Sequence, residues 1–152
     1  MKTTFNISKE SLDITKDIGD KINGLTFHHH YHILYDIGKS FNGEKINYLE
    51  IGCYGGGSAS LMLQLNNITV KSIDLGHPIN SEIAINNINK LNKYNNDYEY
   101  IEGSSFDKKI INKISNDFNS IDILFIDGDH TYSGVKKDFY NYSNFVNKNG
   151  YI

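Results

Sequence analysis

The chain has 152 residues, a formal net charge of −3 at pH 7 and a single cysteine, Cys53, so we expect one domain with its own core and no internal disulfide. It contains no arginine and no run of basic residues, which disfavours a nucleic-acid partner because arginine is the preferred side chain for phosphate and guanine contacts. No apolar run approaches the about 20 residues of a membrane span and no signal-peptide pattern opens the chain, so we expect a cytoplasmic protein without membrane contact.

The first 45 residues are expected to form a helical segment ahead of the main domain, residues 46–152. Apolar residues at roughly helical spacing predict a helix over residues 8–22, with Ser8 as its N-cap. Four histidines follow: His28, His29, His30 and His32. Consecutive histidines fan around a helix, so only His28 and His32 would share a face, and no cysteine is near. We therefore disfavour a metal here and expect a partly exposed lid over the mouth of a ligand site.

The stretch YLEIGCYGGGSASL, residues 48–61, predicts a strand, a glycine turn and a helix whose N-cap is Ser58. Glycines allow positive φ and the close approach of a ligand, and a helix N-terminus offers free N–H groups. The dinucleotide fingerprint G-x-G-x-x-G fails at Tyr54. Instead, Glu50 precedes the first glycine, Gly52, where a carboxylate would repel a pyrophosphate and could accept hydrogen bonds from an ammonium group.

A second strand is expected over residues 69–73 and ends at Asp74. This aspartate follows Gly52 by about 20 residues, the spacing at which the second strand of a βαβ unit finishes beside the first. A carboxylate at that position can accept hydrogen bonds from both hydroxyls of a ribose. A role as a cap in the following turn is the alternative interpretation.

The middle of the chain predicts a helix from Asn80 or Ser81 and a third strand over residues 98–102. The residues after that strand, Ser104, Ser105 and Phe106, could contact a base, the serines by hydrogen bonds and Phe106 by apolar contact. A simple cap for a helix over residues 107–114 is an equally good interpretation.

The most apolar strand is expected over residues 121–126, as for a central parallel strand that is covered on both faces. Asp127, Asp129 and His130 follow it at the carboxyl end, the edge where open α/β sheets bind their ligands. Two carboxylates and an imidazole can hold a hard cation and move a proton, although they could also only cap the next helix. That helix should run through Val135, Phe139, Tyr142 and Val146, and a fifth strand should begin at Gly150.

Three of these motifs together resemble the class I S-adenosylmethionine-dependent methyltransferases. They are LEIGCYGGGS, SIDL and FIDGDHTYSGVKKDF, and the last resembles the metal-dependent sugar and macrolide O-methyltransferases. The resemblance covers about residues 48–152. It implies an α/β, Rossmann-like three-layer sandwich with a parallel sheet in the order 3-2-1-4-5 and N-terminal helices. Strands six and seven of the family fold would be absent, and a homo-oligomer could cover the fifth strand's edge.

The resemblance also implies roles for individual residues in S-adenosylmethionine-dependent O-methylation of a sugar-like or other small hydroxylated acceptor. His130 would be the general base, with Asp129 as the rival base or a second group near the metal. Asp127 would bind Mg²⁺, which polarises the acceptor hydroxyl. The residues expected to contact the cofactor are Glu50, Gly52, Tyr54, Gly56, Gly57, Ser58, Asp74, Ser104, Ser105, Phe106 and Asp127.

Two other functions stay open at this point. The chain could be a non-catalytic module that binds cofactor or a partner protein and needs further segments for activity. An NAD-dependent oxidoreductase is disfavoured by Glu50 and Tyr54, because both depart from the dinucleotide pattern.

Overall fold

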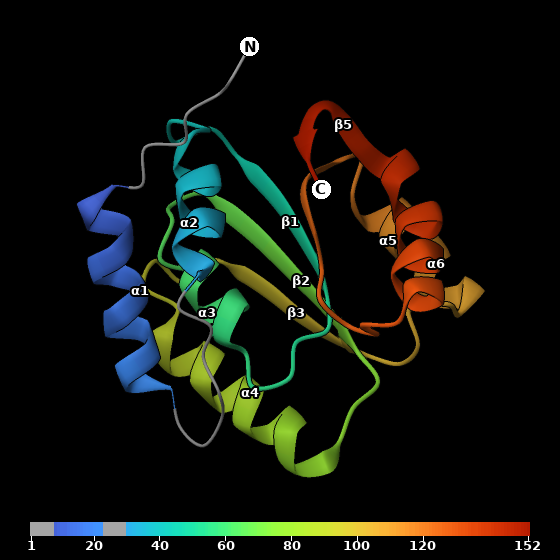
Figure 1. Ribbon diagram of the computed structural model, residues 1–152, viewed down its shortest axis with the longest axis horizontal. Helices are drawn as coiled ribbons and strands as arrows, with labels where there is room; N and C mark the ends of the chain where they lie inside the picture. Colours follow the sequence, from blue (N-terminus) through green and yellow to red (C-terminus); the bar gives the residue numbers. More distant parts are fainter. Residues whose placement is uncertain (1–7, 23–29) are drawn as a thin grey trace.

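The computed structural model describes residues 8–22 and 30–152. Its centre is a five-stranded sheet in the order β3-β2-β1-β4-β5, and each neighbouring pair of strands is parallel (Figure 1). The predicted α/β fold and strand order are confirmed. The strands are β1 (Ile46–Ile51), β2 (Ile68–Asp74), β3 (Asp97–Glu102), β4 (Ile121–Ile126) and β5 (Val146–Tyr151).

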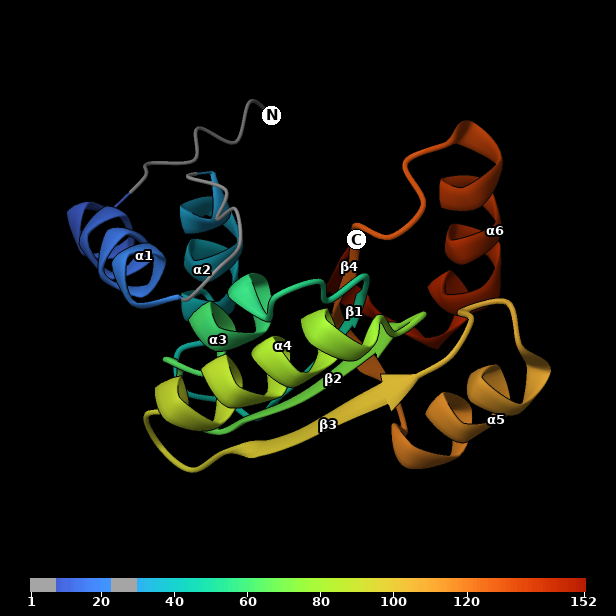
Figure 2. The ribbon, with the colours of Figure 1, turned by 90° about the horizontal axis from the view of Figure 1, so that it is seen from below.

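Helices cover both faces of the sheet (Figure 2). The helices are α1 (Lys9–Lys21), α2 (Tyr31–Lys39), α3 (Gly57–Met62), α4 (Pro78–Leu91), α5 (Lys108–Asp117) and α6 (Tyr132–Tyr142), with a 3-10 turn, η1 (Ser143–Phe145). Side chains of α1 to α4 form one core with Tyr48 of β1, and those of α5 and α6 form a second core with Leu49 of β1. Successive side chains of β1 thus enter opposite cores, which is why a strand inside a parallel sheet is apolar almost throughout.

The two N-terminal helices are joined by a carboxylate. Asp36 of α2 accepts hydrogen bonds from the Ser8 N–H (3.2 Å) and the Ser8 hydroxyl (2.9 Å), and also from the Ser11 hydroxyl. Ser8 is the N-cap of α1, as the sequence predicts, and accepts a hydrogen bond from the Ser11 N–H at 3.1 Å. Buried side chains of both helices, including Ile18 and Leu34, reach the core beside β1.

Two helix starts differ from the prediction. The helix after the glycine turn begins at Gly57 with Gly56 as its N-cap, not Ser58, and it ends at Met62. Gly56 has a φ of 77°, and the Ser58 hydroxyl donates to Glu50 instead of capping. Helix α4 begins at Pro78, slightly before the predicted start, because the first helical position needs no N–H donor.

The end of the chain also differs from the prediction. Helix α6 stops at Tyr142, and β5 already begins at Val146 with an irregular register against β4. On α6 the apolar residues Val135 and Phe139 are exposed, whereas the residues one turn apart on another face are buried: Gly134, Asp138 and Tyr142. Of the apolar residues through which the helix was predicted to run, Tyr142 is buried, whereas Val135 and Phe139 are exposed.

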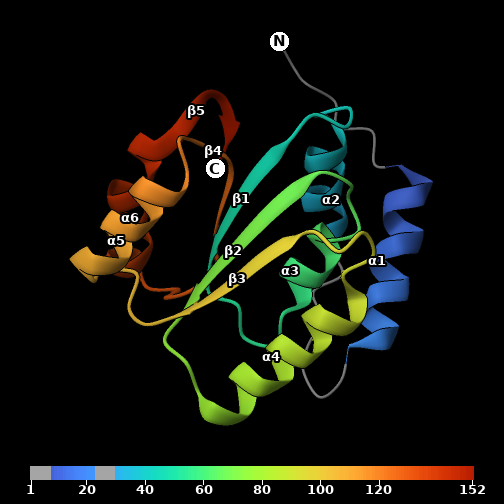
Figure 3. The ribbon, with the colours of Figure 1, turned by 180° about the vertical axis from the view of Figure 1, so that it is seen from behind.

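All five strands run in one direction, so their carboxyl ends lie at one edge of the sheet. Seen from behind, the chain segments that follow β1, β2, β3 and β4 leave the sheet at this edge (Figure 3). Across residues 8–22 and 30–152, none of the helices has the length and apolarity to cross a membrane.

Candidate functional site

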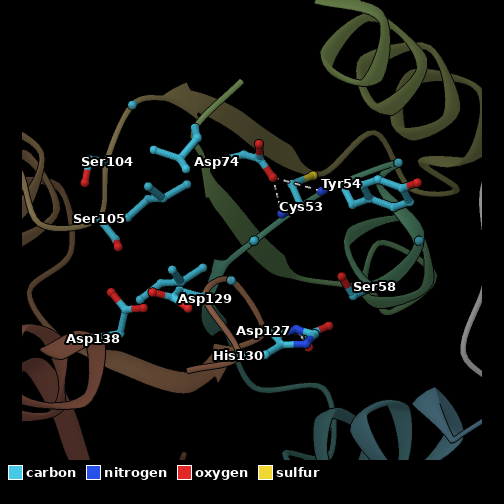
Figure 4. Close-up of a pocket in the computed structure, with 18 of the residues that line it drawn as sticks. Cys53, Tyr54, Ser58, Asp74, Ser104, Ser105, Asp127, Asp129, His130 and Asp138 are labelled. Atoms are coloured by element: carbon cyan, nitrogen blue, oxygen red, sulfur yellow. Dashed lines mark hydrogen bonds and ion pairs between the residues drawn. The ribbon is translucent and has the colours of Figure 1, made fainter. Parts of the chain in front are cut away.

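A cavity of about 510 Å³ opens at the carboxyl edge of the sheet. This volume is within the range of small-molecule sites. Its walls come from the segments that follow β1, β2, β3 and β4, together with Tyr31 of α2 and Asp138 of α6 (Figure 4). The cavity lies where open α/β sheets bind their ligands.

The glycine turn is held by Asp74 at the end of β2. One Asp74 carboxylate oxygen, Oδ2, accepts hydrogen bonds from the backbone N–H groups of Cys53 (2.8 Å) and Tyr54 (2.9 Å). The other oxygen, Oδ1, accepts from the Gly76 N–H at 3.0 Å, an aspartate turn of the kind considered in the sequence analysis. Asp74 also lines the cavity, so the same carboxylate that fixes the turn is available to a ligand.

Gly52 follows β1 and lies against the backbone that follows β4. It has a φ of 92°, and a Cβ there would collide with the backbone of Asp127. The ends of the two strands can approach only because residue 52 has no side chain. The turn after β1 and the segment after β4 therefore lie against each other, and residues of both line the cavity.

Glu50 does not lie where the sequence analysis expected it. It is fully buried, outside the cavity lining, and shares the face of β1 that carries Tyr48. Its carboxylate accepts hydrogen bonds from the hydroxyls of Tyr48 (2.9 Å), Ser58 (2.6 Å) and Ser72 (2.7 Å). Burial raises the pKa of Glu50, and these hydroxyls oppose the shift. The structure therefore gives Glu50 contacts that hold Ser58 and the start of α3, and no surface toward a ligand.

The remaining predicted residues of the glycine turn divide into two groups. Tyr54, Gly57 and Ser58 line the cavity, and Tyr54 is half exposed. Gly56 does not line it, because it faces α4, where a Cβ would press against Ile88. Gly56 is thus a capping and packing glycine in this structure.

The loop after β3 brings all three of its predicted residues to the cavity: Ser104, Ser105 and Phe106. Helix α5 is capped by Asp107, which accepts a hydrogen bond from the Lys109 N–H at 2.8 Å. The two serines are therefore not needed as N-caps. The Ser105 carbonyl accepts a hydrogen bond from the Tyr142 hydroxyl (2.8 Å), which ties this loop to α6.

Asp127 connects two polar side chains at the end of β4. Its Oδ1 lies 3.3 Å from His130 Nε2, and its Oδ2 accepts a hydrogen bond from the Tyr31 hydroxyl at 3.3 Å. The His130 side chain is 77% exposed, so its other ring nitrogen can meet a second molecule. Asp127 and His130 thus form a carboxylate–imidazole pair at the rim of the cavity.

Asp129 is occupied by the turn that starts α6. Its Oδ1 accepts a hydrogen bond from the Thr131 N–H at 2.9 Å, and this backbone contact lowers the pKa of Asp129. Thr131 itself is the N-cap of α6. The alternative interpretation, in which the polar residues after β4 only cap α6, therefore agrees in part with Asp129, which accepts a hydrogen bond from the N-cap residue. It does not agree with His130, which contacts Asp127 instead.

Among the lining residues that the sequence analysis missed, Tyr31 and Asp138 carry a hydroxyl and a carboxylate. Tyr31 is buried and packs edge-on against Phe125, with 6.0 Å between ring centroids. Burial, followed by the charge of Asp127, raises the pKa of Tyr31. Helical spacing alone does not show that either residue is buried, because it does not tell which face of the helix packs inward. The buried residues of α6, namely Gly134, Asp138 and Tyr142, do recur at the regular spacing of one helical turn.

The donor set at the end of β4 does not by itself fit a metal ion. Over the described part of the chain, His, Cys, Asp and Glu side chains form no group of three or more that could hold one. His28 and His29 lie outside the described residues. Asp127 and His130 contribute one carboxylate and one imidazole, and these already contact each other.

Comparison with known proteins identifies the relatives of this chain. A family described as "Methyltransferase domain" matches residues 49–152. An uncharacterized protein of Acanthamoeba polyphaga mimivirus is 39% identical over 141 residues, which are 90% of this chain and 63% of that protein. The chain therefore spans less than two thirds of the length of this relative.

Solved structures share the fold at low sequence identity. One is the MycE methyltransferase of the mycinamycin biosynthetic pathway, in complex with Mg, S-adenosylhomocysteine and mycinamycin VI. The match has a TM-score of 0.64 and a sequence identity of 18%, and it covers 93% of this chain and 36% of MycE. Another is an O-methyltransferase from Bacillus cereus in complex with S-adenosylhomocysteine, with a TM-score of 0.62 and 19% identity over 95% of this chain and 64% of that enzyme.

Proposed function

The chain belongs to the methyltransferase domain family, and from this membership we propose that it binds S-adenosylmethionine in the cavity and transfers the methyl group to an oxygen of a small hydroxylated acceptor, such as a sugar. The observation that carries the proposal is the convergence of three sequence motifs on one cavity. Residues that follow β1, β2 and β4 line it together, and those that follow β3 complete it. Both neighbours described above are methyltransferases bound to S-adenosylhomocysteine.

The proposed binding mode places the three parts of the cofactor along the cavity. The amino-acid part lies at the turn near Gly57 and Ser58, where the backbone can approach it. The ribose hydroxyls bind Asp74, and the base lies against the loop that carries Ser105 and Phe106. This order follows the order of the lining segments in Figure 4, with Ser58 at one side and Ser105 at the other.

The proposed chemistry needs an acceptor oxygen in line with the methyl group and a base that removes its proton. His130 supplies the base in this proposal, since its imidazole is exposed at the cavity rim. Asp127 orients that imidazole and stabilises the positive charge that the ring gains with the proton. Asp129 is the weaker candidate because its hydrogen bond to the Thr131 N–H lowers its pKa.

Metal assistance is a separate proposal. It is supported by the resemblance of the strand-four motif to metal-dependent enzymes and by the Mg bound to MycE. Asp127 is the residue that would contribute a ligand, but the described residues supply too few neighbours for a complete site. The proton transfer to His130 is therefore proposed without any step through a metal ion.

The test is the melting temperature of the purified chain with S-adenosylhomocysteine, with NAD, and with neither. A ligand at 100 times its dissociation constant adds about 2.7 kcal/mol to the free energy of unfolding. Stabilisation by S-adenosylhomocysteine alone is the expected result. Stabilisation by NAD alone would favour an oxidoreductase and contradict the proposal. Binding of S-adenosylhomocysteine without methylation of any hydroxylated acceptor, with Mg²⁺ and with EDTA, would favour a non-catalytic binding module.

A further inference from the structure

Asp138 is a buried carboxylate. The residue is 1% exposed, and within residues 8–22 and 30–152 neither of its carboxylate oxygens has a hydrogen-bond partner. Burial raises the pKa of Asp138, while the nearby Ser105 hydroxyl lowers it and the charge of Asp129 raises it. Buried polar groups in folded proteins are nearly always paired, because leaving one unpaired is costly. A buried carboxylate without a partner therefore indicates that a bound ligand supplies the missing hydrogen-bond donor.

The position of Asp138 shows which part of a ligand it would meet. It lines the cavity at the end formed by α6 and the loop after β3 (Figure 4). These two segments are in contact, because the Tyr142 hydroxyl donates to the Ser105 carbonyl and the Lys137 ammonium lies 5.1 Å from the Phe106 ring centroid. An aromatic ring, a serine and a carboxylate thus share one end of the cavity, which suits a flat heterocycle with a hydrogen-bond donor on its edge.

We propose that the Asp138 carboxyl group accepts a hydrogen bond from the exocyclic amino group of the adenine ring and so selects adenine over a 6-oxopurine. This inference rests on the proposed function, which places S-adenosylmethionine in the cavity with its base at this end. Adenine presents an N–H donor at its 6-position, and hypoxanthine presents a carbonyl oxygen there. A carboxylate pairs with the first and repels the second.

Asp129 is a charged neighbour of Asp138. Its carboxylate lies over Gly134, where a Cβ would collide with it, and Gly134 is one helical turn before Asp138 on the same face of α6. An N–H donor on a base at this end of the cavity would offset the repulsion between the two aspartates.

A metal ion is the other partner that a buried carboxylate could take. The described residues offer no group of three His, Cys, Asp or Glu side chains for it. Asp138 is therefore assigned to a hydrogen-bond donor of the ligand.

The experiment measures the dissociation constants of S-adenosylhomocysteine and S-inosylhomocysteine by calorimetry. These ligands differ only at the 6-position and the adjacent ring nitrogen. The wild-type protein should bind the adenosyl ligand about 10-fold or more tightly, as expected for one charged hydrogen bond. In Asp138→Asn the amide can accept from the amino group or donate to the carbonyl, so the ratio should fall to within about 3-fold. Asp97→Asn, which changes an exposed aspartate outside the cavity, should keep the wild-type ratio.

The outcomes separate this inference from the proposed function. Equal wild-type affinity for the two ligands would overturn the role of Asp138 and leave the cofactor assignment intact, and so would a wild-type ratio in Asp138→Asn. Failure of the wild-type protein to bind either ligand would overturn the proposed function, and the inference with it. The wild-type ratio needs no substitution, so it decides the question even if the variant fails to fold.

Discussion

The hydroxyl of Tyr31 donates a hydrogen bond to Asp127 Oδ2 at 3.3 Å, and the two residues are 96 positions apart in the chain. The contact joins α2 to the end of β4. Because the second oxygen of Asp127 lies 3.3 Å from His130 Nε2, the position of the imidazole depends on an N-terminal helix. A segment outside the sheet thus helps to arrange the proposed base.

Tyr31→Phe should lower turnover by about 10-fold and leave the affinity for S-adenosylhomocysteine within about 2-fold. The substitution removes one hydrogen bond to a charged acceptor, which is worth about 1.5–3 kcal/mol, and leaves Asp127 and His130 free to rotate together. Methylation rates and calorimetric affinities check this. Tyr140→Phe is the matched control, since Tyr140 is 65% exposed on the surface of α6. Unchanged turnover in Tyr31→Phe would contradict a positioning role.

His130→Ala should abolish turnover while cofactor affinity stays close to that of the wild-type protein, because the proposed base contacts the acceptor and not the cofactor. Asp129→Asn is the informative comparison. It keeps the side-chain oxygen that accepts from the Thr131 N–H, so α6 should stay capped and turnover should fall only a few-fold. If Asp129→Asn were inactive and His130→Ala retained activity, the two roles would have to be exchanged.

The centre of the sheet was predictable because β1 and β4 are short apolar runs, followed by Gly52 and Asp127. The runs at residues 46–51 and 121–126 coincide with β1 and β4. Both strands are buried on both faces, because the helices that connect the strands cover the two faces of the sheet. The apolar sequence of these strands therefore agrees with their place in the fold. Helix starts were less predictable. Gly56 is the N-cap of α3 and Pro78 is the first residue of α4, and both positions depend on backbone angles that the spacing of apolar residues does not show.

The site was predictable where its residues lie at the carboxyl end of a strand or in the segment that follows it. Asp74, Ser105 and Asp127 are of this kind, and all three line the cavity. Glu50 lies within β1, and its neighbours are hydroxyls from three separate positions of the chain, so a strand position could not show that it would be enclosed. Tyr31 lies on α2, ahead of all the strands in sequence, and it reaches the cavity only because α2 packs beside the sheet in the folded protein.

Asp74→Ala should weaken both the glycine turn and cofactor binding. Three backbone N–H groups lose their acceptor, so the free energy of unfolding should fall by about 1–3 kcal/mol. The proposed ribose contact would add a loss of about 1.5–3 kcal/mol in binding for each hydrogen bond. Asp74→Asn keeps one side-chain oxygen that can accept hydrogen bonds from the turn. Its melting temperature should therefore lie between those of Asp74→Ala and the wild-type protein. Unfolding curves and calorimetry measure the two effects, and wild-type affinity in a folded Asp74→Ala would disprove the ribose assignment.

Asp36→Asn should destabilise the joined pair of helices α1 and α2 at neutral pH by about 1–2 kcal/mol. Burial raises the pKa of Asp36, but the hydrogen bonds from Ser11 and Ser8 outweigh it, and the net pKa is lowered. A carboxyl group whose pKa is lower in the folded than in the unfolded state contributes stability above its ordinary pKa. That contribution is lost as the pH falls through the folded value.

The difference in stability between the wild-type protein and Asp36→Asn should therefore be constant from pH 7 to about pH 5 and shrink below about pH 4. Urea unfolding at several pH values measures it. Asp20→Asn is the control, because Asp20 is an exposed residue of α1 and should show no such difference. A difference that grew toward low pH would mean that the neutral form of Asp36 is the one favoured by folding, which would contradict the role of its ionised form in joining the helices.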